Sequence, residues 1–472
     1  MEAAGLWMLG TAGIVMLASG LPAWIVLVGV ALAFATAGIA IGMFDSNLFT
    51  ALYSRLVGLL EYDLLQALPL YVLMGSLINR LPLADTLFRV GARALAWTGS
   101  GRALAGLGLG IVLAPMSGSA GASASVLSHA VYPRLGCRGA EHNLALVCLA
   151  STLGVVTPPS LVLIFLGDAM LRAHTEATNV TGLVGRIINT QDVFHAALVP
   201  AAMLLAICVA IVWLTHRAEA PESLAEGTPP SDWIVAIGAL GLVVALLAGV
   251  ALGHLYAVEA AAAGGVALSA YGLATRTLTR KVLAEALEDT LAITGVLFAL
   301  LVAATTFTLV QRAYGTDRWL AALFTQFGTD PAILLATVLA ALALCALVLD
   351  AFEMTFVVIP LVMPPLLMRV PDATWVAVLT LLILQTSFLV PPFGYAVLMV
   401  RSRTASRIPN LALARALAPY IAAQALVLAL VIAFPRMLWR EEVTAQGTPV
   451  SGEKAREMFE KQLEENDRNE PK

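Results

Sequence analysis

The sequence predicts an all-α polytopic membrane protein that contains two related blocks of membrane segments. Of its 472 residues, 60% are hydrophobic and only 12% are charged, whereas ordinary soluble domains have about 25% charged residues. Apolar runs recur along nearly the whole chain, many of them close to the roughly 20 residues that cross a bilayer. Two proline pairs interrupt such runs at corresponding places. We therefore expect ten or more spans, some of them broken.

The apolar runs form two blocks that are separated by a polar segment. Glu2 precedes the first run and no basic residue does; because a secretory signal peptide needs a positively charged start, we expect this run to be a retained span. The runs cover residues 6–20, 21–44, 64–78, 103–115, 144–166, 193–214, 233–252, 256–273, 293–310, 332–349, 356–368, 375–400 and 417–434.

Three stretches are predicted to lie outside the membrane. Residues 216–232 are polar and rich in proline, which is typical of a loop. Residues 276–290 place apolar side chains at near-helical spacing among charges, which favours an interfacial amphipathic helix over the alternative of an ordinary polar loop. Residues 439–472 carry the densest run of charges and are predicted to be a polar, partly disordered tail.

The two blocks share one register. Pro158-Pro159 and Pro391-Pro392 lie 233 positions apart, and this single offset was applied to the chain upstream of both pairs. It superimposes apolar runs on apolar runs and polar breaks on polar breaks, with 103–116 on 336–349, 117 on 350, 135–140 on 368–373 and 144–153 on 377–386. Direct identity is low, but weak internal symmetry of this kind is typical of transporter repeats.

The proline pairs predict broken helices at 152–160 and 385–393. Irregular backbone survives at membrane depth only where it is buried in protein or lines a cavity. Proline removes a backbone donor and frees carbonyl groups of the preceding turn. Freed carbonyls can bind a cation, and the N-terminus of the following half-helix favours an anion. The alternative for each segment alone is a proline kink with a purely structural role.

A second pair of breaks is predicted at 117–123 and 350–354. Around the first, the apolar runs 103–115 and 126–132 are each too short to span, so a re-entrant hairpin fits better than one through-helix; the alternative is a small-residue packing face. The second tip carries Asp350 and Glu353. Carboxylates at membrane depth indicate function because they are costly there, although a water-exposed tip is the alternative.

The sequence favours no enzymatic or nucleic-acid role. It contains no GxxxxGK[ST], GxSxG or HExxH pattern, so ATP hydrolysis or intramembrane hydrolysis inside this chain is not expected. The net charge is −4 and no basic cluster suggests binding to nucleic acid. We expect no enzyme activity and no cofactor.

Four motifs together carry a resemblance to a known family. They are SGSAGASAS (117–125), GVVTPPS (154–160), LDAFEM (349–354) with VVIPLVMPPLL (357–367), and QTSFLVPPFG (385–394). In order and spacing they resemble the large membrane (permease) subunit of tripartite ATP-independent periplasmic (TRAP) transporters, over about residues 5 to 435. The last two motifs look most like the branch associated with keto acids, other monocarboxylates and aromatic carboxylates.

The resemblance implies an elevator-type transporter in a bacterial inner (cytoplasmic) membrane. It would have a scaffold and two inverted repeats, each with a re-entrant hairpin and a broken helix, and would import small organic acids by sodium symport. Its partners would be a small four-helix membrane subunit and a periplasmic substrate-binding protein. A stand-alone ion-coupled organic-anion transporter and a channel remain alternatives.

The resemblance also implies a division of the chain. Scaffold spans would occupy 1–60 and 193–292, the first transport repeat 61–192, the second transport repeat 293–408 and the last span 409–438. The polar tail would follow from residue 439. The segment 168–192 looks like an insertion relative to the short connection in the family.

The residues that the resemblance assigns to substrate and ion binding come from both tips and both broken helices. The first tip, SGSAGA, is poorer in hydroxyls than is usual, which puts its substrate contacts in doubt. Sodium would be held largely by backbone carbonyls near Ser117, Gly154, Asp350 and Thr386. The full set is Ser117, Gly118, Ser119, Gly154, Thr157, Asp350, Glu353, Gln385, Thr386 and Ser387, with Pro158, Pro159, Pro391 and Pro392 as the helix-breaking residues.

Overall fold

Every regular element that the structure describes is a helix, as the composition predicts. The computed structural model describes residues 4–44, 47–60, 63–117, 120–136, 139–157, 160–181, 188–217, 229–326, 330–347, 349–392, 394–404 and 408–438. The predicted tail, the middle of the predicted loop at 216–232, Gly118, Ser119, Pro158 and Pro159 therefore lie outside the described residues.

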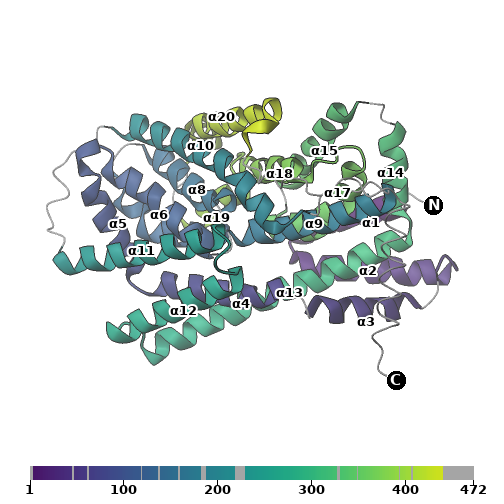
Figure 1. Ribbon diagram of the computed structural model, residues 1–472, viewed down its shortest axis with the longest axis horizontal. Helices are drawn as coiled ribbons and strands as arrows, with labels where there is room; N and C mark the ends of the chain where they lie inside the picture. Colours follow the sequence, from purple (N-terminus) through teal and green to yellow (C-terminus); the bar gives the residue numbers. More distant parts are fainter. Residues whose placement is uncertain are drawn as a thin grey trace, which may run out of the picture. The chain divides into compact units, whose positions relative to one another are not determined.

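The helices follow one another with short connections (Figure 1). They are α1 (Ala4–Ser19), α2 (Ala23–Ala40), α3 (Asn47–Leu60), α4 (Asp63–Arg80), α5 (Leu83–Ala94), η1 (Ala96–Thr98), α6 (Gly101–Ser117), α7 (Ala120–Ala130), η2 (Tyr132–Arg134), α8 (Ala140–Val156), α9 (Leu161–Thr181), α10 (Thr190–His216), α11 (Pro230–Ala251), α12 (Ala257–Ala274), α13 (Arg280–Ala313), α14 (Thr316–Gln326), α15 (Pro331–Cys345), α16 (Ala351–Glu353), the π-helical η4 (Met354–Val358), α17 (Ile359–Leu367), α18 (Ala373–Ser387), α19 (Tyr395–Arg403), α20 (Asn410–Ala433) and η5 (Pro435–Met437).

Helix starts are fixed locally by polar side chains. Asp330 Oδ1 accepts the N–H of Ala332 at 2.9 Å at the start of α15, and Asp372 Oδ1 accepts the N–H of Trp375 at 3.0 Å at the start of α18. Each bond satisfies one of the backbone donors that the first turn of a helix leaves unpaired. Short polar residues therefore set where these helices begin.

The described helices make a multi-pass membrane protein with both continuous helices and bent helix pairs. Five of them, α2, α10, α11, α13 and α20, are long and apolar enough to cross a membrane. Two bent pairs, α4 with α5 (65°) and α8 with α9 (42°), raise the number to seven if each pair is one span. This criterion counts only long helices among the described residues, and six other apolar helices have 10 to 17 residues, so ten or more spans stays a prediction.

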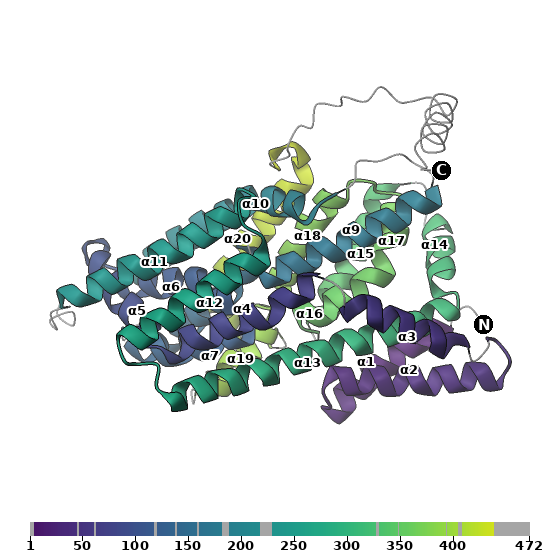
Figure 2. The same ribbon diagram turned by 60° about the horizontal axis from the view of Figure 1, so that its bottom comes forward.

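The helix expected at 276–290 begins at Arg280 and continues without a break as α13. That helix runs unbroken for 34 residues, which is about 50 Å at 1.5 Å per residue and exceeds the roughly 30 Å hydrocarbon core. The amphipathic turns continue into the span because no proline or glycine separates them. Figure 2 shows α13 as a long helix, which packs against α1, α2, α3 and α4.

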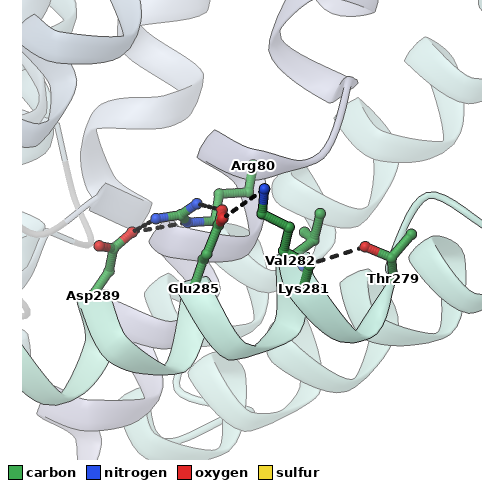
Figure 3. A network of polar contacts seen from close by, with 6 residues as sticks. All are labelled: Arg80, Thr279, Lys281, Val282, Glu285 and Asp289. Carbon is green, nitrogen blue, oxygen red and sulfur yellow. Dashed lines mark hydrogen bonds and ion pairs between the residues drawn. The ribbon is translucent and has the colours of Figure 1, made fainter.

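An ionic network ties the end of α4 to the start of α13 (Figure 3). The Arg80 guanidinium donates to Asp289 Oδ2 at 2.9 Å and 2.6 Å and also bonds to Glu285. Lys281 Nζ lies 4.0 Å from Glu285 Oε1. A cation in the last turn of α4 also suits the helix dipole. The charges of residues 280–290 therefore serve packing between two helices.

The offset of 233 positions also relates helix boundaries that lie far from the prolines. Helix α4 ends at Arg80, and α13 ends at Ala313. Helix α5 begins at Leu83, and α14 begins at Thr316. Helix α8 begins at Ala140, and α18 begins at Ala373. Each of these pairs is separated by 233 residues. A single register thus relates these boundaries of α4, α5 and α8 to those of α13, α14 and α18.

The two halves exchange contacts around α8 and α18. Helix α7 packs on α19, and the corresponding helix α17 packs on α9. Helix α8 contacts both α18 and α19, while α18 contacts α9. Figure 1 shows α8, α18 and α19 near the middle of the view. The half-helices that follow the two proline pairs are therefore each held by the other half of the molecule.

Candidate functional site

The second broken segment begins where the hydrogen-bond pattern of α18 tightens. Phe388 N–H bonds to the carbonyl of Leu384 at 3.2 Å, four residues back, but Leu389 N–H bonds to Thr386 at 3.0 Å, only three residues back. Pro391 and Pro392 follow and have no N–H to donate. The helix therefore ends at Ser387, ahead of the prolines, and α19 starts only at Tyr395.

Gly394 closes this break through a tight backbone approach. Its N–H bonds to Val390 O at 2.8 Å, while Ala396 N–H bonds to Phe388 O at 3.2 Å. A Cβ atom at position 394 would lie 2.5 Å from Phe388 O. Only glycine fits here without a shift of backbone, although its φ of −52° is available to any residue.

The first broken segment is bridged by a serine that the sequence reasoning did not select. Ser160 Oγ donates to Val155 O at 3.2 Å and accepts the N–H of Leu163 at 3.1 Å. It therefore caps the start of α9 while holding the end of α8. Thr157, which was selected, bonds back to Leu153 O through both its N–H (3.0 Å) and its Oγ1 (2.7 Å). Serine directly after a proline pair was the available signal for an N-cap.

A buried hydrogen bond joins the two helices that lead into the breaks. Gln385 Nε2 donates to Thr152 Oγ1 at 2.9 Å, and both residues are 0% exposed. They are 233 positions apart, so each occupies the equivalent place in its half. Gln385 Oε1 is buried and has no hydrogen-bond partner among the described residues. Thr152 was not selected from the sequence, although the shared register points to it once Gln385 is chosen.

The second tip carries two carboxylates that cap their own helix. Asp350 N–H donates to Glu353 Oε2 at 3.1 Å, and the Asp350 side chain accepts from the N–H of Glu353. This reciprocal arrangement is a capping box. It begins a helical stretch that runs through α16, η4 and α17.

Helix α9, the half-helix that follows the first break, also reaches the second tip. Phe165 of α9 packs edge-to-face on Phe356 with ring centroids 5.1 Å apart, and on Phe352 at 6.2 Å. Phe352 lies two residues after Asp350. Elements of both halves therefore meet at this tip through apolar side chains.

The other residues that the resemblance assigns to the site differ in the contacts that they make. Ser387 Oγ donates to Ala343 O of α15 at 3.2 Å, and Thr386 Oγ1 bonds within its own helix to Leu382 O at 2.8 Å. Gly154 is buried in α8, and Ser117 is the last residue of α6. Among the described residues no hydrogen bond or ion pair joins Asp350 or Glu353 to Gly154 or Thr157.

The atoms at the breaks that could bind a cation are oxygen atoms. Within the described ranges, no group of three or more His, Cys, Asp or Glu side chains could hold a metal ion. The breaks offer a cation three kinds of ligand atom: backbone carbonyl oxygens near the helix ends, Gln385 Oε1, and the hydroxyl oxygens of Thr and Ser side chains. Unwound backbone carbonyls are the ligands that broken transporter helices use for Na⁺.

Residues 11–437 match a family described as "Tripartite ATP-independent periplasmic transporter, DctM component". The chain is 22% identical over 403 residues to the sialic acid TRAP transporter permease protein SiaT of Haemophilus influenzae, a match that covers 83% of this chain and 62% of that protein. It thus spans less than two thirds of that protein's length.

Two further relatives match over most of their length. The chain is 24% identical over 441 residues to the sialic acid large permease protein SiaM of Vibrio cholerae, covering 89% of this chain and 94% of that protein. It is 22% identical over 363 residues to the C4-dicarboxylate large permease protein DctM of Pseudomonas aeruginosa, with coverage of 75% and 80%.

Among solved structures, the fold is similar to that of the Alcanivorax borkumensis YdaH transporter. The TM-score is 0.56 at 17% sequence identity, and the match covers 83% of this chain and 90% of that one. At this identity the likeness concerns the arrangement of helices alone.

Proposed function

This chain belongs to the family of DctM components of tripartite ATP-independent periplasmic transporters, and on that premise we propose that it imports small organic acids by sodium symport. The family consists of transporter permeases, so the chain is a large permease subunit and not an enzyme. The observation that most supports coupled transport is the buried Gln385–Thr152 bond, which joins the two helices that lead into the breaks.

In the proposed mechanism, sodium binds first to oxygen atoms at the breaks. The carbonyls freed where α18 tightens, together with Gln385 Oε1, supply neutral ligands. The Asp350 carboxylate at the second tip supplies the negative charge that attracts the cation. The bound cation then lowers the cost of bringing a carboxylate to membrane depth, and the N-termini of α9 and α19 offer it partial positive charge. Substrate binding therefore depends on sodium.

We further propose an elevator movement of two inverted repeats against a scaffold. The helix boundaries in one register and the exchange of contacts between α7, α19, α17 and α9 support a pair of interlocked repeats. Interlocked half-helices would move as one body, carrying the site with them. The spans at 1–60 and 193–292 would form the scaffold against which that body slides.

The proposed partners follow from the tripartite family. They are a small four-helix membrane subunit and a periplasmic substrate-binding protein, and the assembly is assigned to a bacterial inner membrane. Named relatives handle sialic acid and C4-dicarboxylates, both of which carry carboxylate groups. For this chain we propose keto acids, other monocarboxylates or aromatic carboxylates, which the phenylalanines beside the second tip suit.

Uptake into proteoliposomes tests this function. The chain is reconstituted with its small subunit, the cognate binding protein is added outside, and a panel of radiolabelled carboxylates is offered with and without an inward sodium gradient. We expect saturable uptake that requires both sodium and the binding protein. Uptake without the binding protein would indicate a stand-alone transporter, and sodium-independent flux without saturation would indicate a channel.

A further inference from the structure

The end of the span α10 lies against η1, the short segment between α5 and α6. Trp213 Nε1 of α10 donates to Thr98 O at 3.3 Å, and Ser100 Oγ donates to Trp213 O at 3.1 Å. Gly99 has a φ of +70°, and a Cβ atom added there would lie 2.9 Å from Arg217 O. The backbones of the two segments are therefore in close contact, so that side chains from both contribute to one surface.

Two indoles and one guanidinium are exposed on this surface, and we call Trp97, Trp213 and Arg217 the η1 surface. Trp97 is 83% exposed, more than any other large apolar side chain that the structure describes. Trp213 is 37% exposed, and the exposed Arg217 lies over its ring, with Cζ 4.8 Å from the ring centroid. Within the described ranges no carboxylate pairs with Arg217. Tryptophan side chains of this kind concentrate at the level of the lipid head groups.

The chain around the η1 surface carries an excess of positive charge. Residues 86–140 contain five arginines and no aspartate or glutamate. Residues 216–232 add Arg217 and four carboxylates, so six arginines stand against four carboxylates over both segments. One of the four, Asp232, is paired with Arg89 at 2.9 Å. This balance favours an anionic partner at the η1 surface.

The connections between spans indicate that the η1 surface faces the cytoplasm. Arg217 lies between the spans α10 and α11, and α12 packs back on α11. The turn from α12 into α13 is therefore on the same side, and it carries Arg276, Arg280 and Lys281. The connection on the opposite side, residues 252–256, contains no lysine or arginine. Lysine and arginine are enriched in cytoplasmic loops, and anionic lipids make the surface of the cytoplasmic leaflet negative.

We propose that the η1 surface binds the head group of an anionic phospholipid in the cytoplasmic leaflet. The Arg217 guanidinium donates hydrogen bonds to the phosphate, for which its planar fork is suited. The indoles of Trp97 and Trp213 lie beside the glycerol and the first methylene groups of the acyl chains. Bound lipid thus holds the end of α10 and η1 at the membrane surface. The site is separate from the broken helices and does not involve the transported acid.

The test is equilibrium binding of acyl-labelled fluorescent phosphatidylglycerol to the full-length chain, purified with its small subunit and delipidated in a neutral detergent. Unlabelled dioleoylphosphatidylglycerol, dioleoylphosphatidylcholine and glycerol 3-phosphate are the competitors, which separates an anionic lipid from a zwitterionic lipid and from a free phosphate. We expect phosphatidylglycerol to displace the probe at about tenfold lower concentration than phosphatidylcholine does, the scale of one charge-assisted contact. Glycerol 3-phosphate, which lacks acyl chains, should not displace it.

Variants of the η1 surface locate the bound lipid. Arg217→Gln should weaken binding of phosphatidylglycerol about tenfold and abolish the preference over phosphatidylcholine, whereas Arg217→Lys should keep the preference. Trp97→Ala should weaken binding of both lipids about threefold, because it removes an apolar contact. Arg318→Gln is the matched control. It removes one exposed arginine from α14, which follows the other end of the span α13, and should leave binding unchanged.

Three results would overturn the site: wild-type affinity in Arg217→Gln and Trp97→Ala, an equal loss in Arg318→Gln, or equal displacement by the two lipids. Displacement by glycerol 3-phosphate would identify a phosphate site and not a lipid site. Arg217 and Trp97 are exposed, so their variants should fold, and thermal unfolding without added lipid checks this. Trp97→Cys should react with a membrane-impermeant maleimide in inside-out vesicles and not in intact spheroplasts, with the wild type as background. Reaction in spheroplasts would contradict the assignment to the cytoplasmic leaflet.

Discussion

Gln385 Nε2 lies 2.9 Å from Thr152 Oγ1, and these two residues are separated by the same 233 positions that separate the two proline pairs. Equivalent positions of two repeats can touch each other only where an axis relating the repeats passes between them. The hydrogen bond therefore agrees with the two-fold relation of α8 and α18 that we propose. It also holds α8 and α18 together close to the ends at which the two broken segments begin.

Thr152→Val should destabilise the protein, because it leaves the buried amide of Gln385 without its acceptor. An unpaired buried polar group costs about 1–3 kcal/mol, and the double variant Thr152→Val/Gln385→Leu should recover part of that loss. Unfolding in detergent measures both. Thr380→Val is the matched control. The Thr380 hydroxyl is equally buried and, within the described part of the chain, bonds only to Val376 O of its own helix. If the Thr152→Val protein were as stable as the control, the Gln385–Thr152 hydrogen bond would not contribute to stability.

Gly394→Ala should impair transport by distorting the second break. The new Cβ would meet Phe388 O at 2.5 Å, a backbone atom that cannot rotate away. We expect sodium-dependent uptake to fall by about tenfold or more, since a displacement of about 1 Å can cost far more than that in a positioned site. Gly295→Ala in α13 is the control, because no atom lies within 4 Å of its added Cβ. Equal uptake by the two variants would mean that the tight turn is dispensable.

Arg80→Gln should lower stability modestly and in a salt-dependent way. It removes the cation between Glu285 and Asp289, which lie four residues apart on α13 and then repel each other. Since these side chains are 27–46% exposed, the loss should be about 1 kcal/mol or less at low salt and smaller at high salt. Thermal unfolding at two salt concentrations, with Arg89→Gln as control, measures it. A loss that is independent of salt would contradict an electrostatic origin.

The sequence predicts the breaks well because proline acts locally. Pro391 and Pro392 remove two backbone donors in succession, and α18 and α19 are separated there. A proline pair alone does not decide the matter, because Pro364 and Pro365 lie inside α17. The point at which α18 ends is different. It stops at Ser387, where hydrogen bonds tighten ahead of the prolines and Ser387 reaches α15, and such contacts between helices are not visible in one segment of sequence.

The end of the expected helix at 276–290 has a related cause. The structure has a helix there from Arg280 onward, and no proline or glycine lies between it and the apolar span at 293–310, so the two merge into α13. Periodicity identifies a face of a helix but not its end. The ion pair between Arg312 of α13 and Glu176 of α9 could not be predicted at all, because the two helices lie far apart in the sequence.

Asp350 has two possible roles, and its geometry allows them to be separated. In the structure it takes part in a capping box with Glu353, whereas the proposed function gives its charge a part in sodium binding. Asparagine is as good an N-cap as aspartate. Asp350→Asn therefore removes the charge and keeps the cap. Asp330→Asn makes the same change at the start of α15, where Asp330 is exposed and also caps its helix.

The sodium dependence of uptake by Asp350→Asn and Asp330→Asn tests the central claim most directly. Both variants should fold, and Asp330→Asn should reach half-maximal uptake at the wild-type sodium concentration. For Asp350→Asn we expect that concentration to rise by about tenfold, the effect of about 1.4 kcal/mol of lost binding. Wild-type sodium dependence in both variants would contradict the claim that the second tip and the two broken helices form one ion-coupled site.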